Sequence, residues 1–412
     1  MTKRSRKEPP VNRNPNVMRR RTFLAGAAAA AGTMVCPSFV RAGAEGGKRY
    51  RVGVIGHTGR GDYGHGLDQV WLDVPGAEIV AVADADPKGL AEAAKRIQAP
   101  KQYADYRQML EEAKPELLSI CPRFVDEHCE MVLAAVEAGV RGIYMEKPIC
   151  RTLEEADRMV AACEKHKVKV ALAHQTRYSP KLKVVRELIA SGKLGKLLEI
   201  RARGKEDARG GAEDLWVLGP HVLDIMQHLA GKPQWCFASV LQKGRPITKA
   251  DVRPGTEGIG LLAGDEVHAM YRLAGGVVGS FDSLKDAGGG PRFGAWIFGS
   301  KGVIEIGTNY MPGAWFLPHT SWSTPRYKKG WSEITSAGLG KPETLKKTTP
   351  HDGNVAAVED LIAAVEQDGK PVADITEART ALEMVVAVFE SQRLAKPATI
   401  PLACRTDPLA AF

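Results

Sequence analysis

The chain has 412 residues, 44% of them hydrophobic and 25% charged, which is enough apolar material for buried cores in about two domains. The net charge of +9 is concentrated at the start, because residues 1–44 carry nine basic residues against Glu8 alone and leave 48 basic and 47 acidic residues in the remainder. A remainder so nearly neutral exerts no general attraction on phosphate backbones or anionic lipid, and we expect no nucleic-acid partner.

Residues 1–44 have the features of a twin-arginine signal peptide. Arg20 and Arg21 precede a weakly apolar Ala/Gly run, and the small residues 42–44 offer a cleavage site after Ala44. The alternative is an uncleaved anchor, but the apolar run is too short and too rich in alanine to span a bilayer well. We therefore expect a periplasmic protein, exported folded and without membrane attachment after cleavage. The six later cysteines form no CxxC pair and are expected to be buried free thiols.

From Tyr50 onwards, β-branched apolar runs alternate with helical patterns. The predicted strands are residues 51–56, 78–84, 116–122, 142–145 and 168–173. The predicted helices are residues 87–97, 105–113, 127–138 and 152–166, the last opening with a capping box. This alternation predicts an α/β fold with a Rossmann-type, doubly wound parallel sheet over residues 48–173.

The pattern changes after residue 174. Helices at 180–191 and around 220–230 flank a predicted strand at 197–204, and further strands follow at 266–273, 277–283, 295–300 and 302–307. Strands without intervening helices predict a second α/β domain over residues 174–402 with a mainly antiparallel open sheet. Residues 286–294 and 307–350 are predicted as long loops, and helices at 353–367 and 375–392 close the chain.

The stretch GHTGRGDYGHG, residues 56–66, follows the first predicted strand. Its Gly-x-Gly-x-x-Gly pattern begins at Gly59, three residues later than the usual first glycine of a dinucleotide-binding turn, where Gly56 stands. We expect the turn to precede a helix whose N-terminus faces a pyrophosphate, with cofactor contacts from Gly56, Thr58, Gly59, Arg60 and Gly61. A glycine-rich turn without a ligand is the other interpretation.

Asp84 ends the second predicted strand, where an acidic side chain suits the two hydroxyls of an adenosine ribose. The carboxylate should repel a 2′-phosphate, so this residue favours NAD, while Arg60 leaves NADP as the alternative.

Lys147 stands in the sequence EKP, directly after the predicted strand 142–145. It therefore lies at the carboxyl edge of the parallel sheet, where doubly wound folds bind ligands, and Pro148 restricts it to extended geometry. An ammonium held there could stabilise a developing alkoxide during hydride transfer. The alternative is an ion pair with Glu146 or a neighbouring carboxylate at a turn.

The glycine-rich turn, Asp84, EKP, the sequence RYSP at 177–180 and the GxHxxD pattern at 219–224 together resemble the Gfo/Idh/MocA family over about residues 48–402. The resemblance implies NAD(P)-dependent oxidation or reduction of sugars, cyclitols and related polyols. It also implies a second domain whose open sheet often mediates oligomers, so we expect a homo-oligomer. It places Lys147 between nicotinamide and substrate, commonly with a cis bond before Pro148, and makes His221 the acceptor of the alcohol proton.

The resemblance also assigns residues around the crevice. It implies cofactor contacts from Pro122, His128, Glu146 and Lys147. The substrate contacts that we expect are Arg177, Trp216, His221 and Asp224, with the indole of Trp216 stacking on a sugar face unless its charged segment 201–216 is a solvated loop.

One position departs from the family pattern. The aspartate usually found four residues before the histidine is Val217 here, so Asp207, Asp214 or Asp224 would have to orient His221, or the chemistry differs. His221, Asp224 and His228 share one helical stripe, but their spacing matches no strong metal-ligand pattern, and we expect no metal site.

Export bears on the mechanism, because the periplasm offers no obvious pool of nicotinamide to exchange with. A useful cofactor would have to stay bound and be regenerated within the cycle. Our leading hypothesis is an NAD(P)-dependent oxidoreductase of a sugar, cyclitol or related polyol with tightly bound cofactor, in which Lys147 stabilises the reacting oxygen and His221 is the base. The alternatives are an NAD-dependent glycoside-cleaving enzyme that oxidises its sugar transiently and a non-catalytic carbohydrate-binding protein of the same fold.

Overall fold

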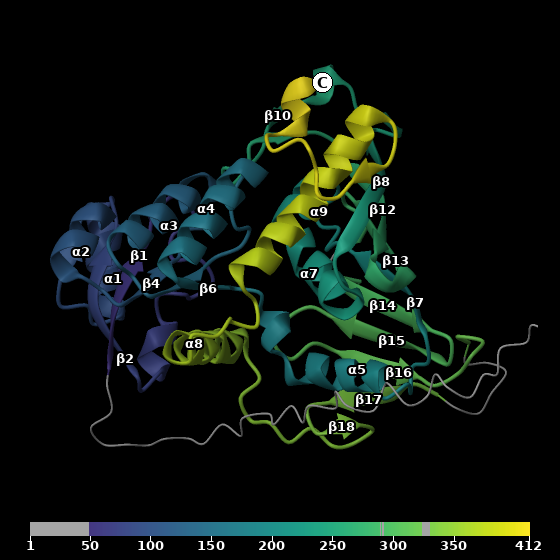
Figure 1. The fold of residues 1–412 in the computed structure, drawn as a ribbon, viewed down its shortest axis with the longest axis horizontal. Helices are drawn as coiled ribbons and strands as arrows, with labels where there is room; N and C mark the ends of the chain where they lie inside the picture. The colour runs from purple at the N-terminus through teal and green to yellow at the C-terminus, as the bar shows by residue number, and fades with distance from the viewer. Residues whose placement is uncertain (1–48, 289, 291, 324–329) are drawn as a thin grey trace, which may run out of the picture. The chain divides into compact units, whose positions relative to one another are not determined.

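Two β-sheets organise the chain (Figure 1). The computed structural model describes residues 49–288, 290, 292–323 and 330–412, so the predicted signal peptide, residues 1–44, lies outside the described residues. The first sheet has six parallel strands in the order β3-β2-β1-β4-β5-β6. Its strands are β1 (Tyr50–Ile55), β2 (Ala77–Ala83), β3 (Gln102–Tyr103), β4 (Leu117–Ile120), β5 (Gly142–Met145) and β6 (Lys169–Leu172). The predicted Rossmann-type sheet is confirmed, with the short β3 as an addition.

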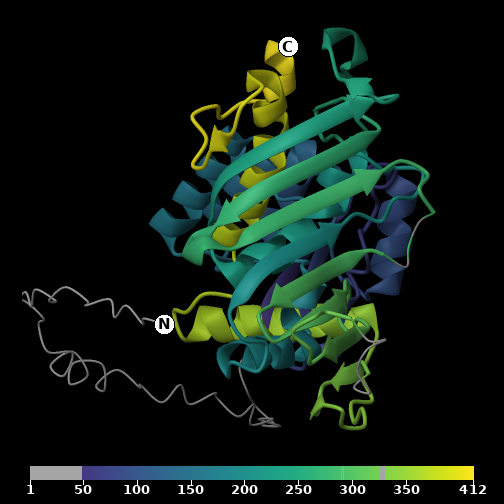
Figure 2. The same cartoon turned by 90° about the vertical axis from the view of Figure 1, so that its right-hand side faces the viewer.

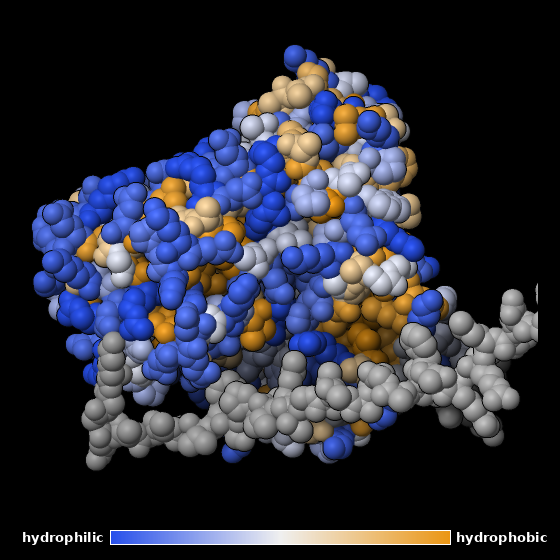
Figure 3. Space-filling view, viewed as in Figure 1, coloured by the Kyte–Doolittle hydropathy of each residue, from blue (hydrophilic) through white to orange (hydrophobic). Residues whose placement is uncertain are grey.

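Four helices connect these strands: α1 (Pro87–Arg96), α2 (Tyr106–Ala113), α3 (His128–Glu137) and α4 (Leu153–His166). Each of three begins behind a side-chain cap, because Asp86, Asp105 and Thr152 accept hydrogen bonds from backbone N–H groups of the first helical turn. Hydrophilic residues dominate the visible surface over these helices, as expected for helices that bury one apolar face against a sheet (Figure 3).

The connection from β1 to β2 differs from the prediction. The expected helix after the glycine-rich turn is absent, and the described residues there form turns followed by the 3-10 helix η1 (Val70–Asp73). The reason is local: four glycines of the stretch adopt positive φ angles between 60° and 89°, which ends any helical run (Gly59, Gly61, Gly64 and Gly66).

The late helix α8 (Pro350–Glu366) packs against η1, β5 and β6. Its N-terminus carries a capping box between Thr349 and Asp352, and its Val358 and Leu361 join the apolar cluster that lies under the first sheet. A segment from the end of the chain therefore completes the core of the first sheet, which sequence order does not suggest.

The second sheet has eleven strands in the described residues, ten of them in the order β18-β17-β16-β15-β14-β7-β13-β12-β8-β19, with β9 paired to β8. They are β7 (Leu197–Arg203), β8 (Pro233–Gln242), β9 (Arg245–Pro246), β12 (Glu266–Leu273), β13 (Val278–Leu284), β14 (Gly294–Gly299), β15 (Gly302–Gly307), β16 (Ala314–Leu317), β17 (Ser332–Thr335), β18 (Gly338–Leu339) and β19 (Ala398–Thr399). The pairs are antiparallel except β7 with β13. The predicted mainly antiparallel sheet is confirmed; β10 (Arg253–Pro254) and β11 (Leu261–Leu262) pair separately.

Two parts of this sheet were not predicted. The ten-residue strand β8 was missed, and the stretch 307–350, expected to be a loop, contains β16, β17 and β18. These three strands have two to four residues, too few to display a period of two, and they form because β15 offers a partner edge for β16.

Helices α5 (Pro180–Ala190), α6 (Ala212–Val217), α7 (Gly219–Ala230) and α9 (Ile375–Leu394) complete the second part, and α9 packs against β8, α7 and α4. The opposite face of the sheet is not covered by helices (Figure 2). Large exposed side chains lie along its strands: Phe237, Met270, Trp296 and Trp315. Within the described ranges, no helix combines the length and the apolar character needed to cross a membrane.

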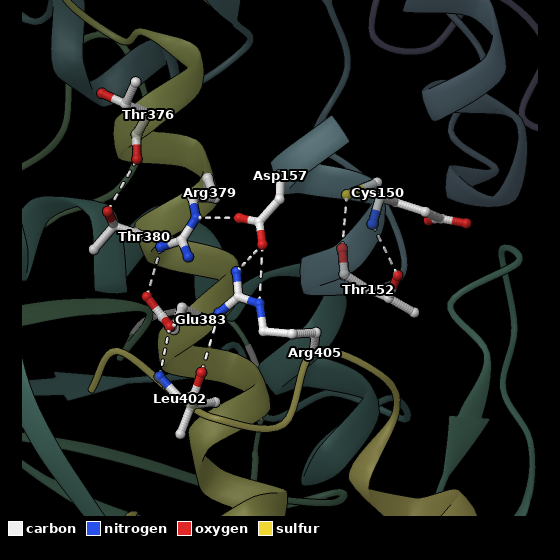
Figure 4. Close-up of polar contacts among 10 residues, drawn as sticks. Cys150, Thr152, Asp157, Thr376, Arg379, Thr380, Glu383, Leu402 and Arg405 are labelled. Carbon is white, nitrogen blue, oxygen red and sulfur yellow. Dashed lines mark hydrogen bonds and ion pairs between the residues drawn. The ribbon is translucent and has the colours of Figure 1, made fainter. Parts of the chain in front are cut away.

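An ion-pair network joins the two parts (Figure 4). Asp157 on α4 accepts hydrogen bonds from Arg379 of α9 (3.0 Å) and from Arg405 of the C-terminal segment (2.9 Å). Glu383, whose side chain is 2% exposed, accepts from Arg379 (2.7 Å) and from the backbone N–H of Leu402 (2.8 Å). The network therefore anchors α9 and the C-terminal segment to a helix of the first sheet.

We expect Glu383→Gln to lower the free energy of unfolding by about 2 kcal/mol. Of the four charged side chains in this network, Glu383 is the one that is buried, and the substitution removes its charge. The value lies below the usual range for a broken buried pair because Arg379 and Arg405 are partly solvated. Urea unfolding followed by circular dichroism measures the change. The control is Glu92→Gln, which breaks a solvent-exposed pair with Lys88 and should cost about 0.5 kcal/mol or less. Equal losses in the two variants would contradict this role for Glu383.

Candidate active site

A cavity of about 250 Å³, here called the lysine cavity, opens at the carboxyl edge of the first sheet. Lys147 reaches it from the loop after β5, and His221 reaches it from the first turn of α7. Its other lining residues include His65, Glu146, Gln175, Thr176, Phe293 and Asn309. The two side chains predicted to carry the chemistry are thus in one cavity, although they are 74 positions apart in the sequence.

Lys147 is held in place although only 6% of it is exposed. Its ammonium donates a hydrogen bond to the backbone carbonyl of Val217 (3.0 Å), and the bond to Pro148 is cis, as the family resemblance implied. Burial lowers the pKa of the ammonium, while the carboxylates of Glu146 and Glu257 act in the opposite direction. An ammonium has three donors, so two remain for groups inside the cavity.

Position 217 contributes a backbone group to the site. The backbone carbonyl of Val217 binds the ammonium of Lys147 at the point in the sequence where the family pattern has an aspartate. None of the three suggested substitutes contacts the ring of His221: Asp207 pairs with Arg209, Asp214 accepts from Ser283, and Asp224 pairs with Arg177. Within the described residues, His221 has no carboxylate partner.

His221 lies against two other rings, with centroid distances of 5.7 Å to His174 and 6.2 Å to Phe293. Burial lowers the pKa of His221 well below its usual value, and the charges of Lys147, His174 and His65 lower it further. The imidazole is therefore neutral near pH 7, and it presents a lone pair that can accept a proton.

His65 is a cavity residue that the sequence did not reveal. It was not among the predicted site residues, but it lines the lysine cavity and contacts Glu146. One oxygen of Glu146 accepts from the backbone N–H of His65 (2.9 Å) and from its Nδ1 (2.5 Å), and the other accepts from the backbone N–H of Lys147 (3.1 Å). Glu146 is fully buried, so these bonds replace its contacts with water. The only sequence signal was the position of His65 between two glycines.

The glycine-rich stretch, residues 56–66 and here called the glycine segment, crosses the edge of the sheet. A Cβ atom on Gly61 would lie 2.4 Å from the backbone nitrogen of Arg123, and one on Gly64 would lie 2.5 Å from the carbonyl oxygen of Cys121. Only glycine allows the segment to approach the loop after β4 this closely. Gly56, the expected first glycine of the turn, is covered by the ring of Tyr63, which a Cβ would approach to 2.2 Å.

Arg60 and Thr58, both predicted cofactor contacts, are bonded within the protein. Arg60 pairs with Asp126 (2.6 Å) and Glu127 (3.1 Å) at the end of the loop after β4. The backbone N–H and the hydroxyl of Thr58 donate to the carboxylate of Asp84, at 3.1 Å and 2.7 Å. Thr58 and Arg60 therefore fix the glycine segment to the sheet edge by charge-assisted hydrogen bonds.

A second cavity of about 530 Å³, here called the aspartate cavity, lies at the same edge. Its lining includes Gly56, His57, Asp84, Asp105, Tyr106 and Asp126. The carboxylate of Asp84 also accepts from the backbone N–H of Asp86 (2.9 Å), so its acceptor positions face protein donors. Its contact with a ribose remains a prediction, and it requires the hydroxyl of Thr58 to give way.

The two cavities together present groups that suit a dinucleotide. The aspartate cavity has the volume of an ordinary small-molecule site and contains the acidic residue that suits a ribose. The lysine cavity is smaller and contains a cation and imidazole groups. The glycine segment contributes His57 to the aspartate cavity and His65 to the lysine cavity, so it runs from one cavity to the other. Its residues Thr58, Gly59, Arg60 and Gly61 remain the predicted contacts of the pyrophosphate.

His128 and Pro122, both predicted cofactor contacts, are hydrogen-bonded to each other. His128 is fully buried and lines neither cavity. Its ring nitrogens lie within hydrogen-bonding distance of the carbonyl oxygens of Pro148 (3.0 Å) and Pro122 (2.8 Å). The residue therefore ties the loop after β4 to the loop that carries Lys147, and it supports the site without lining it.

Three predicted substrate contacts do not reach the lysine cavity. Arg177 and Asp224 pair with each other at 2.9 Å, with both side chains 2% exposed, and Arg177 also pairs with Glu377 (2.5 Å). Trp216 lies on α6 in the core of the second part, so neither face of its indole is free to stack on a sugar. Helical spacing placed these residues on an inward face but could not distinguish a cavity wall from a packed core.

The described residues contain no group of three His, Cys, Asp or Glu side chains arranged to hold a metal ion. Their cysteines are all free thiols, five of them buried and Cys404 partly exposed.

The chain is similar to several curated dehydrogenases. It is 28% identical over 249 residues to the levoglucosan dehydrogenase of Pseudarthrobacter phenanthrenivorans, a match that covers 54% of this chain and 63% of that one. It is 29% identical over 218 residues to the D-apiose dehydrogenase of Paraburkholderia graminis, covering 50% and 56%. It is 26% identical over 258 residues to the myo-inositol 2-dehydrogenase of Thermotoga maritima, covering 62% and 74%. The chain thus spans about three fifths of the length of the first two relatives.

Solved structures share the fold at lower identity. A levoglucosan dehydrogenase in complex with NADH and L-sorbose superposes with a TM-score of 0.70 at 20% identity, over 86% of this chain and 100% of that one. An oxidoreductase from Agrobacterium radiobacter in complex with NAD+, L-tartaric acid and magnesium gives a TM-score of 0.65 at 18% identity, over 86% and 99%.

Two sequence models of one family match consecutive parts of the chain. The model described as "Oxidoreductase family, NAD-binding Rossmann fold" matches residues 50–174, and the model described as "GFO/IDH/MocA C-terminal domain" matches residues 182–305. The first covers the parallel sheet with the glycine segment and Lys147, and the second covers α7 with His221 and the centre of the second sheet. The chain therefore belongs to the Gfo/Idh/MocA family of oxidoreductases, and its first domain is an NAD-binding Rossmann domain.

Proposed function

We propose that the protein is an NAD-dependent oxidoreductase that acts on a hydroxyl group of a sugar, cyclitol or related polyol and keeps its cofactor tightly bound. The observation that carries this proposal is the lysine cavity, in which a buried ammonium and a neutral imidazole share a space of about 250 Å³ at the carboxyl edge of the Rossmann sheet. The relatives named for dehydrogenation of levoglucosan, D-apiose and myo-inositol support the substrate class.

Each residue of the lysine cavity has a separate role in the proposed reaction. Lys147 donates one hydrogen bond to Val217 and directs its remaining N–H groups at the substrate oxygen, where they stabilise the negative charge that develops during oxidation. His221 accepts the hydroxyl proton, since its ring is neutral. Thr176, Gln175 and Asn309 provide hydrogen-bonding groups for other hydroxyls of the substrate. When bound, NAD accepts the hydride from the carbon that is oxidised.

A redox-neutral reaction on the same scaffold is the second candidate, because a further histidine, His65, lines the same cavity. Transient oxidation of a sugar acidifies the neighbouring C–H bond and permits cleavage of a glycosidic bond before the hydride returns. Such an enzyme needs more than one proton-accepting group.

We expect Lys147→Met to retain bound NAD and the native fold but to lose turnover by a factor of about 100 or more, because the ammonium that stabilises the reacting oxygen is removed. Turnover is measured as reduced nicotinamide with levoglucosan, D-apiose, myo-inositol and scyllo-inositol, and as aglycone release with aryl glycosides. NAD is identified by mass spectrometry after denaturation of the purified protein.

The control for this experiment is Lys88→Met, which changes an exposed lysine of α1 and should leave turnover intact. Normal turnover in Lys147→Met would contradict the proposed mechanism. A wild-type protein that binds these sugars without NAD and without turnover would instead be a non-catalytic binding protein.

We propose further that the protein reaches the periplasm folded, through the twin-arginine route, with residues 1–44 as its signal. Replacing Arg20 and Arg21 by lysine should leave the uncleaved precursor in the cytoplasm, as detected by cell fractionation. Arg13→Lys, seven residues upstream of the pair, is the control. Export of the double variant at the wild-type level would argue against this route.

We also propose that the uncovered face of the second sheet joins two copies of the chain. Phe237, Met270, Trp296 and Trp315 expose large apolar surface along its strands, and burial of such surface favours association. Trp296→Glu should shift the mass measured by light scattering towards the monomer. Leu72→Glu on η1, which changes another exposed apolar residue elsewhere, should not. A monomeric wild-type protein would exclude this arrangement.

A further inference from the structure

His65 and Glu146 form a pair at the lysine cavity to which the proposed oxidation by Lys147, His221 and NAD gives no role. The ring of His65 reaches the cavity from the glycine segment, and Glu146 lies beneath it at the end of β5. The pair is part of the same site as Lys147, since the second oxygen of Glu146 accepts from the backbone N–H of that lysine.

The pair determines which nitrogen of His65 carries a proton. Burial alone would raise the pKa of Glu146, but the hydrogen bond from His65 and the charges of His65 and Lys147 lower it to about 2. An ionised carboxylate only accepts hydrogen bonds, so Nδ1, 2.5 Å from the carboxylate oxygen, must donate. In the neutral ring, the lone pair is then on Nε2.

The ring is held by its backbone as well as by its side chain. The N–H of His65 donates to Glu146 (2.9 Å), and its carbonyl oxygen accepts from the buried side chain of Asn354 (3.2 Å). Gly64 brings the backbone so close that a Cβ there would lie 2.7 Å from Glu146. These contacts fix the ring, although its side chain is 53% exposed.

Nε2 is free to act. No residue in the described ranges hydrogen-bonds to it, while the ring lines the same cavity as Lys147 and His221. His221 lacks a carboxylate partner, and the nearby cation of Lys147 disfavours a proton on its ring. Of the two imidazoles, His65 is the one whose ring contacts a carboxylate in the described residues, with Glu146 at Nδ1 and Nε2 directed away from it.

We propose that His65 is a second proton-accepting catalytic residue of this site, that Glu146 is its positioning residue, and that the proton lost by the substrate hydroxyl finally passes to Nε2 of His65. The inference rests on the proposed function. The O–H bond of the substrate breaks and His221 accepts the proton first; the new N–H bond of His221 then breaks as one forms at Nε2 of His65. The electron pair left on the oxygen beside Lys147 forms the carbonyl bond, and the hydride leaves the same carbon for NAD. The partly exposed ring then returns the proton to solvent.

The first test is the protonation state of His65 in the full-length holoenzyme labelled with 15N-histidine. Long-range nitrogen–proton NMR spectra at neutral pH should show a protonated Nδ1 and an unprotonated Nε2, with the signals assigned by their loss in His65→Gln. Glu146→Gln should abolish this preference, because an amide can donate as well as accept. A proton on Nε2 in the wild-type protein would overturn the proposal without any bearing on the proposed function.

The second test is kinetic and uses whichever of the four sugars and polyols named above is turned over. His65→Gln should lower kcat by about 100-fold or more with bound NAD unchanged, and Glu146→Gln should alter the acid side of the pH profile in parallel with the NMR result. His166→Gln, an exposed histidine at the end of α4, is the control and should behave as wild type. Wild-type kcat in His65→Gln would overturn the role of His65 alone, whereas absence of turnover in the unmodified enzyme overturns the proposed function and the proton transfer with it.

Discussion

The buried carboxylate of Glu146 is the interaction on which the site depends. It accepts two hydrogen bonds from His65 and one from the backbone of Lys147, and none of it is exposed to solvent. A carboxylate without water must be satisfied by the protein, so the glycine segment and the end of β5 are held together by the cost of leaving that charge unpaired. Both a potential base and the ammonium of the site thereby acquire fixed positions.

The glycine segment explains why this Rossmann domain differs from the expected turn and helix. Its positive φ angles and its close approach to Cys121 and Arg123 carry the chain across the sheet edge, where a helix N-terminus would otherwise stand. The face of the sheet that such a helix would cover is packed by η1 and by α8 from the end of the chain. The same path delivers His65 to the lysine cavity and fixes Arg60 to the acidic residues after β4.

The second part of the chain completes the site rather than only covering it. The carbonyl of Val217 at the end of α6 holds the ammonium of Lys147, and α7 presents His221 beside it. Behind them, the contacts of Asp157 with Arg379 and Arg405 tie a helix of the first part to α9 and the C-terminal segment, and the buried pair of Arg177 and Asp224 fixes α7 to the segment after β6. A cavity lined from both parts requires such anchoring, because catalytic distances tolerate little movement.

The sequence by itself determined the features that depend on local periodicity and on residues next to strand ends. Alternation of strands and helices predicted the parallel sheet, and the position of Lys147 directly after β5 predicted its place at the carboxyl edge. The matching family pattern paired Lys147 with His221, and the structure places both in one cavity. These predictions succeeded because side-chain period and the place of a residue relative to a strand end are properties of short segments.

Tertiary structure decided the rest, because each remaining feature depends on a partner distant in the chain. Trp216, Arg177 and Asp224 have the side chains of a binding site, yet packing against other helices buried them outside the cavity. His65 had no distinguishing pattern and acquired its role only through Glu146, 81 residues later. The carbonyl of Val217 is a backbone group, which residue identity cannot reveal, and it binds Lys147 only because α6 ends beside the loop after β5.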